Sequence, residues 1–332
     1  MADLSKGRIL VTGGAGFLGS AVIWELNRRG ATNILVTDFL GTDEKWKNLV
    51  PLRFFDYVEA DEFLGRLASS PSLFSNITTV FHLGACSSTT ETDAGYLIRN
   101  NFEYTKTLAH FALERGRRFV YASSAATYGS IAAGLPETVN LDSLRPLNMY
   151  GYSKHLFDLY AARQGMLPRM TGLKYFNVFG PNEYHKGEMR SVAHKAFHQI
   201  METGTVSLFK SYRPEFSDGG QRRDFLYVKD AVAATIFLAE HECGGGLYNI
   251  GSGEPNTWLS LVRAIFAALS REPKIQFIEM PEYLREKYQY FTCAHIDKLR
   301  SAGFKQKMTP LHDAVYDYVR HYLVPGKHLG DE

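Results

Sequence analysis

A glycine-rich loop near the start of the chain constrains its fold more than any other feature. The loop, Gly13-Gly-Ala-Gly-Phe-Leu-Gly19, directly follows an apolar, strand-like segment at residues 8–12 and leads into a helix-like segment at residues 17–29. Its glycines permit a tight turn, close approach of the backbone to a pyrophosphate, and close packing of the strand against the helix. The helix N-terminus would then face the phosphates. In this setting the loop predicts a dinucleotide-binding site.

The nature of the dinucleotide depends on two residues that follow the second strand-like segment, residues 33–37. Asp38 ends this segment, and an acidic residue about 20 positions after the loop commonly binds the ribose hydroxyls of adenosine, which favours NAD. Lys45 lies a few residues further on, and its ammonium can instead reach the 2′-phosphate of NADP. The residues alone leave this choice open.

The segments that follow predict an α/β fold. Residues 78–83 and 118–122 have the pattern of buried strands, with a helix expected between them at about residues 91–115. Strands that alternate with helices favour a doubly wound parallel Rossmann sheet with right-handed crossovers. Small residues from Gly84 to Thr90 follow the first of these strands, where a cofactor can lie across the sheet edge. Cys86 among them is expected to pack and not to act as a nucleophile, because no base is near it in the sequence.

Tyr150 and Lys154 are the candidate catalytic pair. They are spaced four positions apart, so on a helix they lie on one face. An ammonium near a phenol favours the phenolate and lowers the pKa of the tyrosine, and such a phenol can exchange a proton with an alcohol while a nicotinamide exchanges the hydride. Ser124, expected at the carboxyl end of the preceding strand, can hydrogen-bond the reacting oxygen. A pair of this kind is usually a surface pair, but here the loop and the serine accompany it, which favours an oxidoreductase-type site.

Length, charge and cysteine content exclude several other classes of protein. A chain of 332 residues can hold one large α/β domain and a smaller lobe. Its 37 basic and 35 acidic residues nearly cancel, which argues against a surface that binds nucleic acid. The 3 cysteines are far apart and form no CxxC motif, so neither a metal site nor a disulfide framework is expected. No apolar run reaches the ~18 residues of a membrane span and no signal-peptide pattern is found, so we expect a cytoplasmic protein that does not enter membranes.

The loop, Ser124, Tyr150 and Lys154 together resemble the extended short-chain dehydrogenase/reductases, over essentially the whole chain. Members of this family act mostly on nucleotide-sugars and form homo-oligomers, which the resemblance implies here too. After residue 177 the segments become shorter. We therefore expect a dinucleotide-binding Rossmann domain over residues 1–177, to which residues 222–252 return strands and a helix, and a smaller C-terminal α/β lobe for substrate, mainly over residues 178–330.

Further segments resemble the branch of this family that inverts C6″ of an ADP-linked heptose, a precursor of lipopolysaccharide. They are residues 84–91, the segment around Tyr175, the His185-Lys-Gly187 block and residues 288–292. The resemblance implies an isomerase that oxidises and re-reduces the ADP-heptose with bound NADP, with NAD possible. It also implies that Tyr150 and Lys186 are the acid and base, assisted by Ser124 and Lys154.

The binding residues are implied by the same resemblance. The implied cofactor-binding residues are Gly13, Gly16, Phe17, Leu18, Gly19, Asp38, Phe39, Lys45, Leu83, Gly84, Ala85, Cys86, Ser87, Asn100, Lys154, Val178 and Lys186. The implied substrate-binding residues are Ser124, Asn177, Glu188, Lys195, Phe209, Lys210, Ser211, Tyr212, Arg223 and Tyr288. Arg223 suits a diphosphate, because a guanidinium donates to two oxygens at once. Residues 211–221 are expected to form a surface loop that can act as a lid.

Some residues depart from the family's pattern. Phe39, Ala60, Leu83, Glu188 and Lys195 stand where asparagine, lysine, glutamate, serine and histidine are often found. The absence of a lysine at position 60 removes a cationic partner for a 2′-phosphate. We therefore expect only a modest preference for NADP.

Two other functions remain open at this point. One is another nucleotide-sugar epimerase or a dehydratase. Dehydratases of the family carry acidic residues directly after the activating hydroxyl, where this chain has Ala125 and Ala126. The other is a cofactor-sensing regulator on a Rossmann fold, which usually lacks the catalytic tyrosine or lysine. Both residues are present here, which favours an enzyme.

Overall fold

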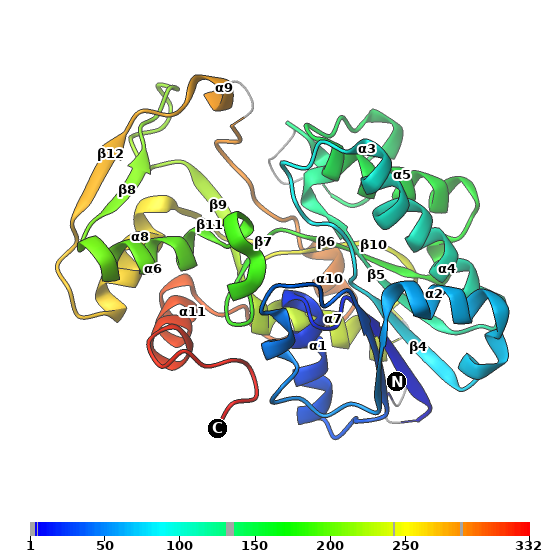
Figure 1. Cartoon of the computed structure of the whole chain (residues 1–332). Coiled ribbons are helices and arrows are strands. Elements are labelled where there is room, and N and C mark those ends of the chain that lie inside the picture. Colours follow the sequence, from blue (N-terminus) through cyan, green and yellow to red (C-terminus); the bar gives the residue numbers. More distant parts are fainter. Residues whose placement is uncertain (1–3, 5, 131–135, 242, 286–287) are drawn as a thin grey trace.

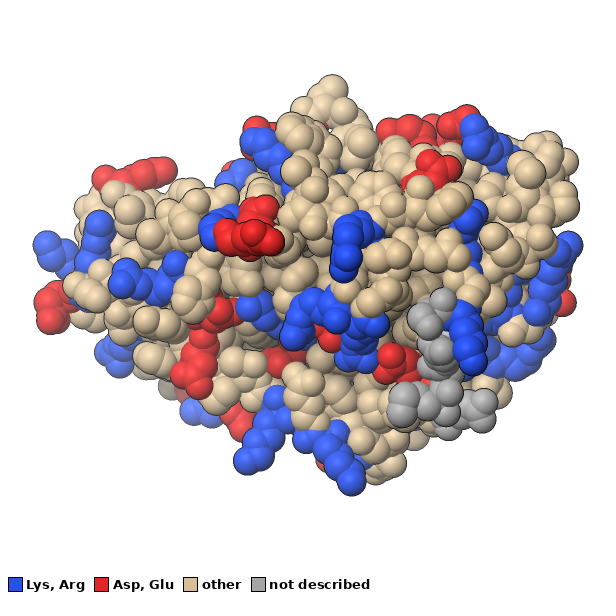
Figure 2. Space-filling model, turned by 90° about the horizontal axis from the view of Figure 1, so that it is seen from below, with Lys and Arg blue, Asp and Glu red and all other residues tan. Residues whose placement is uncertain are grey.

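A computed structural model describes residue 4 and residues 6–130, 136–241, 243–285 and 288–332. Residues 1–3 and 5, on which the expected lack of a signal peptide partly depends, lie outside this part of the chain. Within the described residues, no helix is long and apolar enough to cross a membrane. Figure 2 shows that lysine and arginine are interspersed with aspartate and glutamate on the face seen from below, which agrees with the net charge of +2.

Seven parallel strands form the large sheet, in the order β10-β6-β5-β4-β1-β2-β3 (Figure 1). Their bounds are Arg8–Thr12 for β1, Ile34–Asp38 for β2, Asp56–Glu59 for β3, Ile77–His82 for β4, Arg118–Ser124 for β5, Thr171–Tyr175 for β6 and Gly246–Ile250 for β10. The expected parallel Rossmann sheet is confirmed. The strand order reverses between β1 and β4, and ligands of such sheets bind at this switch point.

Helices cover both faces of the large sheet. Two of them, α1 (Phe17–Arg28) and α7 (Val228–Glu240), pack on one face, and three others, α2 (Ala60–Ser69), α4 (Tyr104–Glu114) and α5 (Met149–Arg163), pack on the other. Because side chains alternate along a strand, Ile9 and Val11 of β1 belong to the first core and Leu10 to the second. Strand β1 is therefore apolar on both sides, as expected of a strand in a covered parallel sheet.

A smaller lobe lies beside this sheet (Figure 1). It contains a three-stranded sheet, β11-β9-β7, and a two-stranded sheet, β12-β8. The strands are β7 (Asn177–Phe179), β8 (Val206–Phe209), β9 (Arg222–Tyr227), β11 (Pro255–Thr257) and β12 (Ile275–Ile278). The helices of this half are α6 (Val192–Thr203), α8 (Trp258–Ala268), α9 (Glu282–Arg285), α10 (Asp297–Ser301) and α11 (Leu311–Tyr318).

The expected strand at residues 171–177 is in fact two strands in different sheets. The break is at Phe176, whose N–H donates to the Ile250 carbonyl at 3.0 Å. Before it, β6 lies in the large sheet, and after it, β7 pairs with β9 in the small one. The chain therefore leaves the Rossmann sheet at this point. Similarly, β9 lies in the small sheet, whereas α7 directly after it packs on α1.

The expected helix at about residues 91–115 begins three residues later and is not uniform. It starts with α3 (Ala94–Leu97), where the Asp93 carboxylate accepts from the Tyr96 N–H at 2.9 Å. It continues as a π-helix over Ile98–Glu103 and then as α4. A π-helical turn inside a helix is frequently found near a functional site.

Residues 211–221 contain no helix and only the last of them borders a strand, so the expected loop is confirmed.

Candidate active site

A cavity of about 360 Å³ opens at the carboxyl ends of β1, β4, β5 and β6. It is lined by Gly13, Gly16, Phe17, Leu18, Gly19, Asp38, Lys45, Leu83, Gly84, Ala85, Ser87, Ala122, Ser123, Ser124, Tyr150, Lys154, Tyr175, Phe176, Asn177, Val178, His185 and Lys186. A second cavity, of about 290 Å³, shares five of these residues and is lined further by Thr37, Phe39, Ala60, Cys86, Tyr96, Asn100 and Tyr104. The two cavities form a long site across the switch point of the sheet.

The glycine-rich loop leaves no room for side chains. Gly13 has a φ of +66°, and a Cβ atom added there would lie 2.5 Å from the Cα of Gly84. A Cβ atom on Gly19 would lie 2.0 Å from the Gly13 carbonyl oxygen. The loop therefore packs directly against the chain after β4 and against α1. Because α1 begins at Phe17 without a side-chain cap, its first N–H groups are suited to an anion.

Asp38 holds this loop in place. Its Oδ2 accepts from the N–H groups of Ala15 at 2.9 Å and Gly16 at 3.1 Å. Its Oδ1 accepts from the Phe39 N–H at 2.7 Å and from Lys45 Nζ at 3.1 Å. Asp38, which favoured NAD, and Lys45, which favoured NADP, therefore form an ion pair. The negative charge of Asp38 is largely compensated.

Tyr150 and Ser124 come together at the edge between α5 and β5. The first turn of α5 is capped by Asn148, whose Oδ1 accepts from the Gly151 N–H at 2.8 Å. Tyr150 lies in this turn, and Ser124 ends β5. Burial raises the pKa of Tyr150 above its ordinary value, and a hydrogen bond with Ser124 opposes that increase. A hydroxyl and a phenol thus meet at the cavity wall, where they can bind one alcohol oxygen between them.

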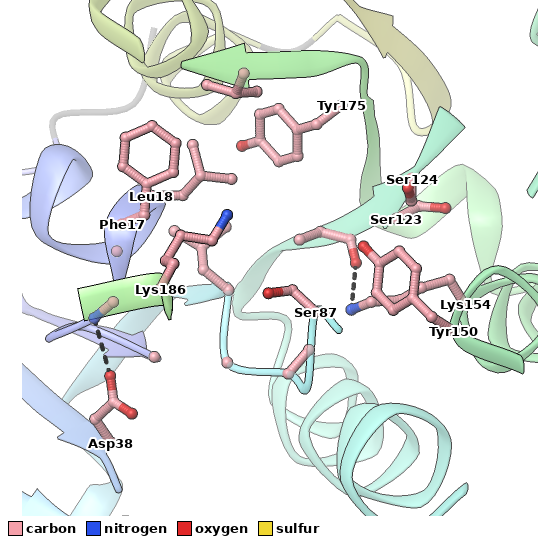
Figure 3. A pocket seen from close by; sticks show the side chains of 18 of the residues that line it. Phe17, Leu18, Asp38, Ser87, Ser123, Ser124, Tyr150, Lys154, Tyr175 and Lys186 are labelled. Atoms are coloured by element: carbon pink, nitrogen blue, oxygen red, sulfur yellow. Dashed lines mark hydrogen bonds between the residues drawn. The ribbon is translucent and has the colours of Figure 1, made fainter. Parts of the chain in front are cut away.

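Lys154 does not lower the pKa of Tyr150 as the sequence led us to expect. Its Nζ donates to the Ala122 carbonyl at 2.9 Å (Figure 3), and burial outweighs any effect of its charge on the phenol. Burial also lowers the pKa of Lys154 itself to about 8, with Asp158 and Cys86 acting in the opposite direction. The expectation was wrong because sequence spacing gives the direction of a side chain but not how deeply it is buried.

Lys186 enters the cavity from the opposite side. It belongs to a 3₁₀ segment, Tyr184–Met189, in which Gly187 has a φ of +52°. Figure 3 shows its amine pointing into the pocket across from Tyr150. The Nζ atom lies 5.3 Å from the centre of the Phe17 ring, and burial lowers the pKa of Lys186, with Glu183 opposing. A lysine in this setting is neutral more often at neutral pH than a surface lysine, as a base must be.

Glu183 fixes the segment that carries Lys186. Its buried carboxylate accepts from the Gly180 N–H at 3.2 Å, the Ser191 N–H at 2.5 Å and hydroxyl at 2.7 Å, and the Tyr318 hydroxyl at 3.0 Å. These donors come from both sides of the segment and from α11. Lys186 is therefore held on a rigid turn, even though the turn itself is not a regular helix.

The residues implied for the substrate are divided between the cavity and the small lobe. Asn177 lines the cavity, and its Oδ1 accepts from the Thr292 hydroxyl at 3.2 Å. Arg223 is 7% exposed and lies between two rings, 5.2 Å from the centre of Tyr288 and 5.5 Å from that of Trp258. The Trp258 N–H donates to the Tyr288 hydroxyl at 2.9 Å, so the two aromatic side chains hold each other around the guanidinium.

The segment Phe209–Tyr212 lies in the same lobe. The Phe209 ring contacts that of Tyr288 edge-on, with centroids 6.4 Å apart. Lys210 forms an ion pair with Glu279 at 2.6 Å, and the Tyr212 hydroxyl donates to the same carboxylate. The Ser211 N–H donates to Asp218 at 2.7 Å. These contacts attach one end of the 211–221 loop to the lobe.

Glu188 and Lys195 lie apart from the cavity. They form an ion pair with each other at 3.0 Å, and the Glu188 side chain is 98% exposed.

Several cavity residues were absent from the sequence-based set, namely Ala122, Ser123, Tyr175, Phe176 and His185. Some were signalled by neighbours, since His185 precedes Lys186 and Ser123 precedes Ser124. Burial lowers the pKa of His185 to about 4, so this ring is neutral at neutral pH.

Comparisons with known proteins show the family of this chain. The model of the NAD dependent epimerase/dehydratase family matches residues 9–251. An ADP-L-glycero-D-manno-heptose-6-epimerase of Nitratidesulfovibrio vulgaris (strain DP4) is 51% identical over 315 residues, which are 95% of this chain and 97% of that protein. One of Fusobacterium nucleatum is 45% identical over 325 residues, 95% of this chain and 98% of the relative.

Solved structures share the fold. The Helicobacter pylori ADP-L-glycero-D-manno-heptose-6-epimerase superposes with a TM-score of 0.82 at 26% identity, and the match covers 97% of this chain and 98% of the other. A UDP-N-acetylglucosamine 4-epimerase from Methanobrevibacter ruminantium has a TM-score of 0.79 at 23% identity, with 98% and 100% covered. At that identity the second likeness concerns the fold alone.

Proposed function

Because the chain belongs to the NAD dependent epimerase/dehydratase family, we propose that it interconverts the C6″ epimers of an ADP-linked heptose. The reaction is the one named for a relative that is 51% identical over 95% of the chain. The secondary alcohol at C6″ is oxidised to a ketone and then reduced from the other face. The oxidation and the reduction balance, so the reaction consumes no external oxidant or reductant.

One observation carries this proposal: Tyr150 and Lys186 face the same cavity from opposite sides (Figure 3). Inversion of a carbon requires proton exchange with its oxygen in two orientations of the sugar. A single acid–base group can serve both orientations only if the C6″ oxygen stays beside that group while the rest of the keto-sugar turns. Two groups on opposite walls can each serve one orientation.

The residues around the two cavities fit a nicotinamide dinucleotide. The glycine loop permits close approach of a pyrophosphate to the N-terminus of α1, and the second cavity provides a place for the adenosine beside Phe39, Tyr96 and Asn100. When bound, the nicotinamide supplies the chemistry of accepting a hydride from C6″ and returning it. Its ring would lie beside Tyr150 and Lys154, at the other end of the site.

The chain's own side chains then handle the proton. Tyr150, with Ser124 beside it, binds the C6″ oxygen and takes its proton in one orientation of the sugar. Lys186 does so in the other orientation, because burial favours its neutral form. Lys154 holds the dinucleotide next to Tyr150, and its ammonium is fixed on the Ala122 carbonyl.

We further propose that NADP is preferred over NAD by a modest margin. Lys45 lines both cavities and is the cation nearest to the expected position of the 2′-phosphate. Its partner Asp38 opposes a phosphate there, but the carboxylate is already compensated by Lys45 and by two N–H groups of the loop. Ala60, also in this cavity, offers no second cation.

The diphosphate of the substrate is assigned to Arg223. Its guanidinium is buried between Tyr288 and Trp258 and uses part of its N–H groups on the carbonyls of Arg222 and Gln289. The remaining N–H groups can form bidentate hydrogen bonds with phosphate oxygens. Asn177 lines the catalytic cavity and accepts a hydrogen bond from Thr292, so its side chain can contact the sugar.

A substrate panel tests the proposed function. The purified protein is incubated separately with ADP-D-glycero-D-manno-heptose, UDP-glucose and UDP-N-acetylglucosamine, and each product is analysed by NMR. The nucleotide released on denaturation is identified by mass spectrometry. We expect conversion of the ADP-heptose alone and release of a nicotinamide dinucleotide. Faster turnover of either UDP-sugar would contradict the proposed substrate.

A further inference from the structure

A buried ion pair lies behind the catalytic residues. Lys174, on β6, and Asp158, on α5, are 2.7 Å apart between Nζ and Oδ2, and both side chains are fully buried. Removing two charges from water is expensive, and such pairs are often no more stabilising than apolar residues of the same volume. A pair at this depth therefore needs an explanation other than stability.

The pair links α5 to the end of β5. Asp158 accepts from the Tyr121 hydroxyl at 2.9 Å and from the Ser123 hydroxyl at 2.8 Å. Lys174 Nζ donates to the Thr127 hydroxyl at 2.6 Å, which in turn donates to the Ser124 carbonyl at 2.8 Å. The network thus holds the strand end from both sides of the residue that faces Tyr150.

Asp158 also lies close to the catalytic side chains along α5. It follows Lys154 by one helical turn and Tyr150 by about two. The Lys154 Nζ donates to the carbonyl of Ala122, between the two β5 residues that Asp158 binds. Three successive residues of β5, from Tyr121 to Ser123, are therefore hydrogen-bonded to α5 side chains.

We propose that Asp158 is a positioning residue for the reaction: it fixes the register of α5 on β5, which brings Tyr150 to Ser124, and it keeps Lys154 in its ammonium form. Lys174 is the counter-charge that allows a carboxylate to be buried at this place. The inference rests on the proposed function only through the role of Lys154 in holding the dinucleotide.

The charges around Lys154 are consistent with this role. Burial lowers the pKa of Lys154 to about 8, and the Asp158 carboxylate is the largest influence in the opposite direction. The titratable groups that face Lys154 are Tyr150 and Asp158 on α5, Cys86 after β4, and His82 on β4. Those that face Asp158 are Lys174 on β6, Tyr121 on β5, Tyr128 after β5, and His155 on α5.

These surroundings give the sign of the expected effect. Burial lowers the pKa of His82 well below its ordinary value, so this ring stays neutral and contributes no charge as the pH rises. Without the Asp158 carboxylate, the pKa of Lys154 falls further below 8. Lys154 then loses its proton, and its hold on the dinucleotide, at a lower pH than in the unaltered protein.

The test is the pH dependence of dinucleotide binding, measured between pH 6 and 10 with NADH and NADPH by fluorescence. The unaltered protein should lose affinity as the pH rises past the pKa of Lys154. In Asp158→Asn, which keeps the shape and loses the charge, the loss should begin roughly one pH unit lower. The shift should be the same for both dinucleotides, because Lys154 lies far from the adenosine end.

A second variant separates charge from folding. Asp158→Asn alone leaves Lys174 buried without its carboxylate, which is destabilising. The double variant Asp158→Asn/Lys174→Gln removes both charges and keeps side chains that can hydrogen-bond to each other. It should melt closer to the unaltered protein than the single variant. Its pH dependence should shift in the same direction but by less, because the charge of Lys174 is lost together with that of Asp158.

The control is Asp142→Asn, which makes the same change in net charge. Asp142 is exposed and pairs with Arg163 at 2.8 Å on the surface, so this variant should bind both dinucleotides with the unaltered pH dependence. An unshifted profile in the folded double variant would overturn the proposal and leave the pair with a purely structural role. Because no sugar takes part, an error in the proposed substrate leaves this result unaffected.

Discussion

Tyr150 and Lys186 extend into one cavity from opposite walls, the first from the start of α5 and the second from the 3₁₀ segment after β7 (Figure 3). They are held by different means. Tyr150 lies on a capped helix that side chains tie to β5, whereas Lys186 lies on a turn that the buried Glu183 fixes. Neither group depends on the other for its position, so each can be removed separately.

Tyr150→Phe should remove turnover and leave folding and dinucleotide content unchanged. Only the hydroxyl that exchanges the proton is lost, and the ring still fills its place beside Ser124. A positioned acid–base group contributes ~10² to 10⁴ in rate, so the variant should be slower by at least that factor. Activity is followed by NMR of the two ADP-heptose epimers, and bound nucleotide by its absorbance. Turnover like that of the unaltered protein would exclude Tyr150 from the mechanism.

Lys186→Met should keep the bound dinucleotide and lose most epimerase activity, whichever C6″ epimer is supplied. The substitution roughly keeps the length of the side chain but removes the amine, which lies over the Phe17 ring. The matched control is Lys106→Met, a surface lysine that pairs with Glu103 at 3.0 Å, which should be fully active. If Lys186→Met were fully active too, a single acid–base group would suffice.

An aldehyde analogue of the substrate, shortened to a C6″ aldehyde, separates the two groups more sharply. It can be reduced and, as its hydrate, oxidised directly, so that two aldehyde molecules and one water yield one alcohol and one acid. With two acid–base groups, the variants Tyr150→Phe and Lys186→Met should each retain part of this dismutation and the double variant should lose it. Complete loss in either single variant would contradict independent roles.

Lys45→Ala should narrow the preference for NADP over NAD. The lysine is the cation of this part of the site, and its loss leaves Asp38 to repel a 2′-phosphate without compensation. Binding of both dinucleotides to protein freed of nucleotide is measured by calorimetry. We expect NADPH to lose affinity and NADH to be little changed. An unaltered protein that binds NADH more tightly than NADPH would refute the preference itself.

Stability should fall as the pH decreases from about 6.5, and His194 should contribute to this loss. Its ring is 3% exposed, its Nδ1 has no hydrogen-bond partner within the described residues, and burial together with His198, Arg190 and Lys195 lowers its pKa to about 3. The unfolded chain, with an ordinary histidine pKa of about 6.5, therefore binds a proton that the folded chain does not. Between these two values, stability rises with pH.

The measurement is urea unfolding at pH 7.5 and pH 5.0 with His194→Phe, which keeps a ring and removes the titration. The variant should lose less stability on acidification than the unaltered protein. The pH slope of its free energy of unfolding should be smaller by the contribution of up to about one proton taken up on unfolding. An equal loss in both proteins would show that His194 is protonated in the folded state.

The sequence predicted those features that depend on local chemistry. Glycines at fixed spacing after an apolar segment predicted the tight turn at Gly13 and the close packing at Gly19. The alternation of strand-like and helix-like segments predicted the parallel sheet. Tyr150, Lys154 and Ser124 line one cavity, from a helix and a strand end at the positions that the sequence predicted for these elements. The Lys186 position followed from the resemblance alone, since it lies on an irregular turn that no periodicity reveals.

Features that depend on distant contacts were beyond such reasoning. The sequence around Phe176 does not signal that the strand changes sheets there, because residues 173–179 contain no glycine or proline. The break is set by contacts with β10 and β9. The depth at which Tyr150 and Lys154 are buried decides their pKa values, and depth results from packing of the whole fold. Asp158 and Lys174 are 16 positions apart in the sequence, and nothing local indicates that they meet.

The central claim is that this site inverts C6″ by removing and returning a hydride. It is tested most directly by incubating the protein with ADP-D-glycero-D-manno-heptose in D₂O and following C6″ by NMR. We predict an equilibrium mixture of both C6″ epimers in which C6″ keeps its hydrogen, because a bound nicotinamide would supply hydride chemistry that does not exchange with solvent. Absence of inversion, or inversion with deuterium at C6″, would contradict the account.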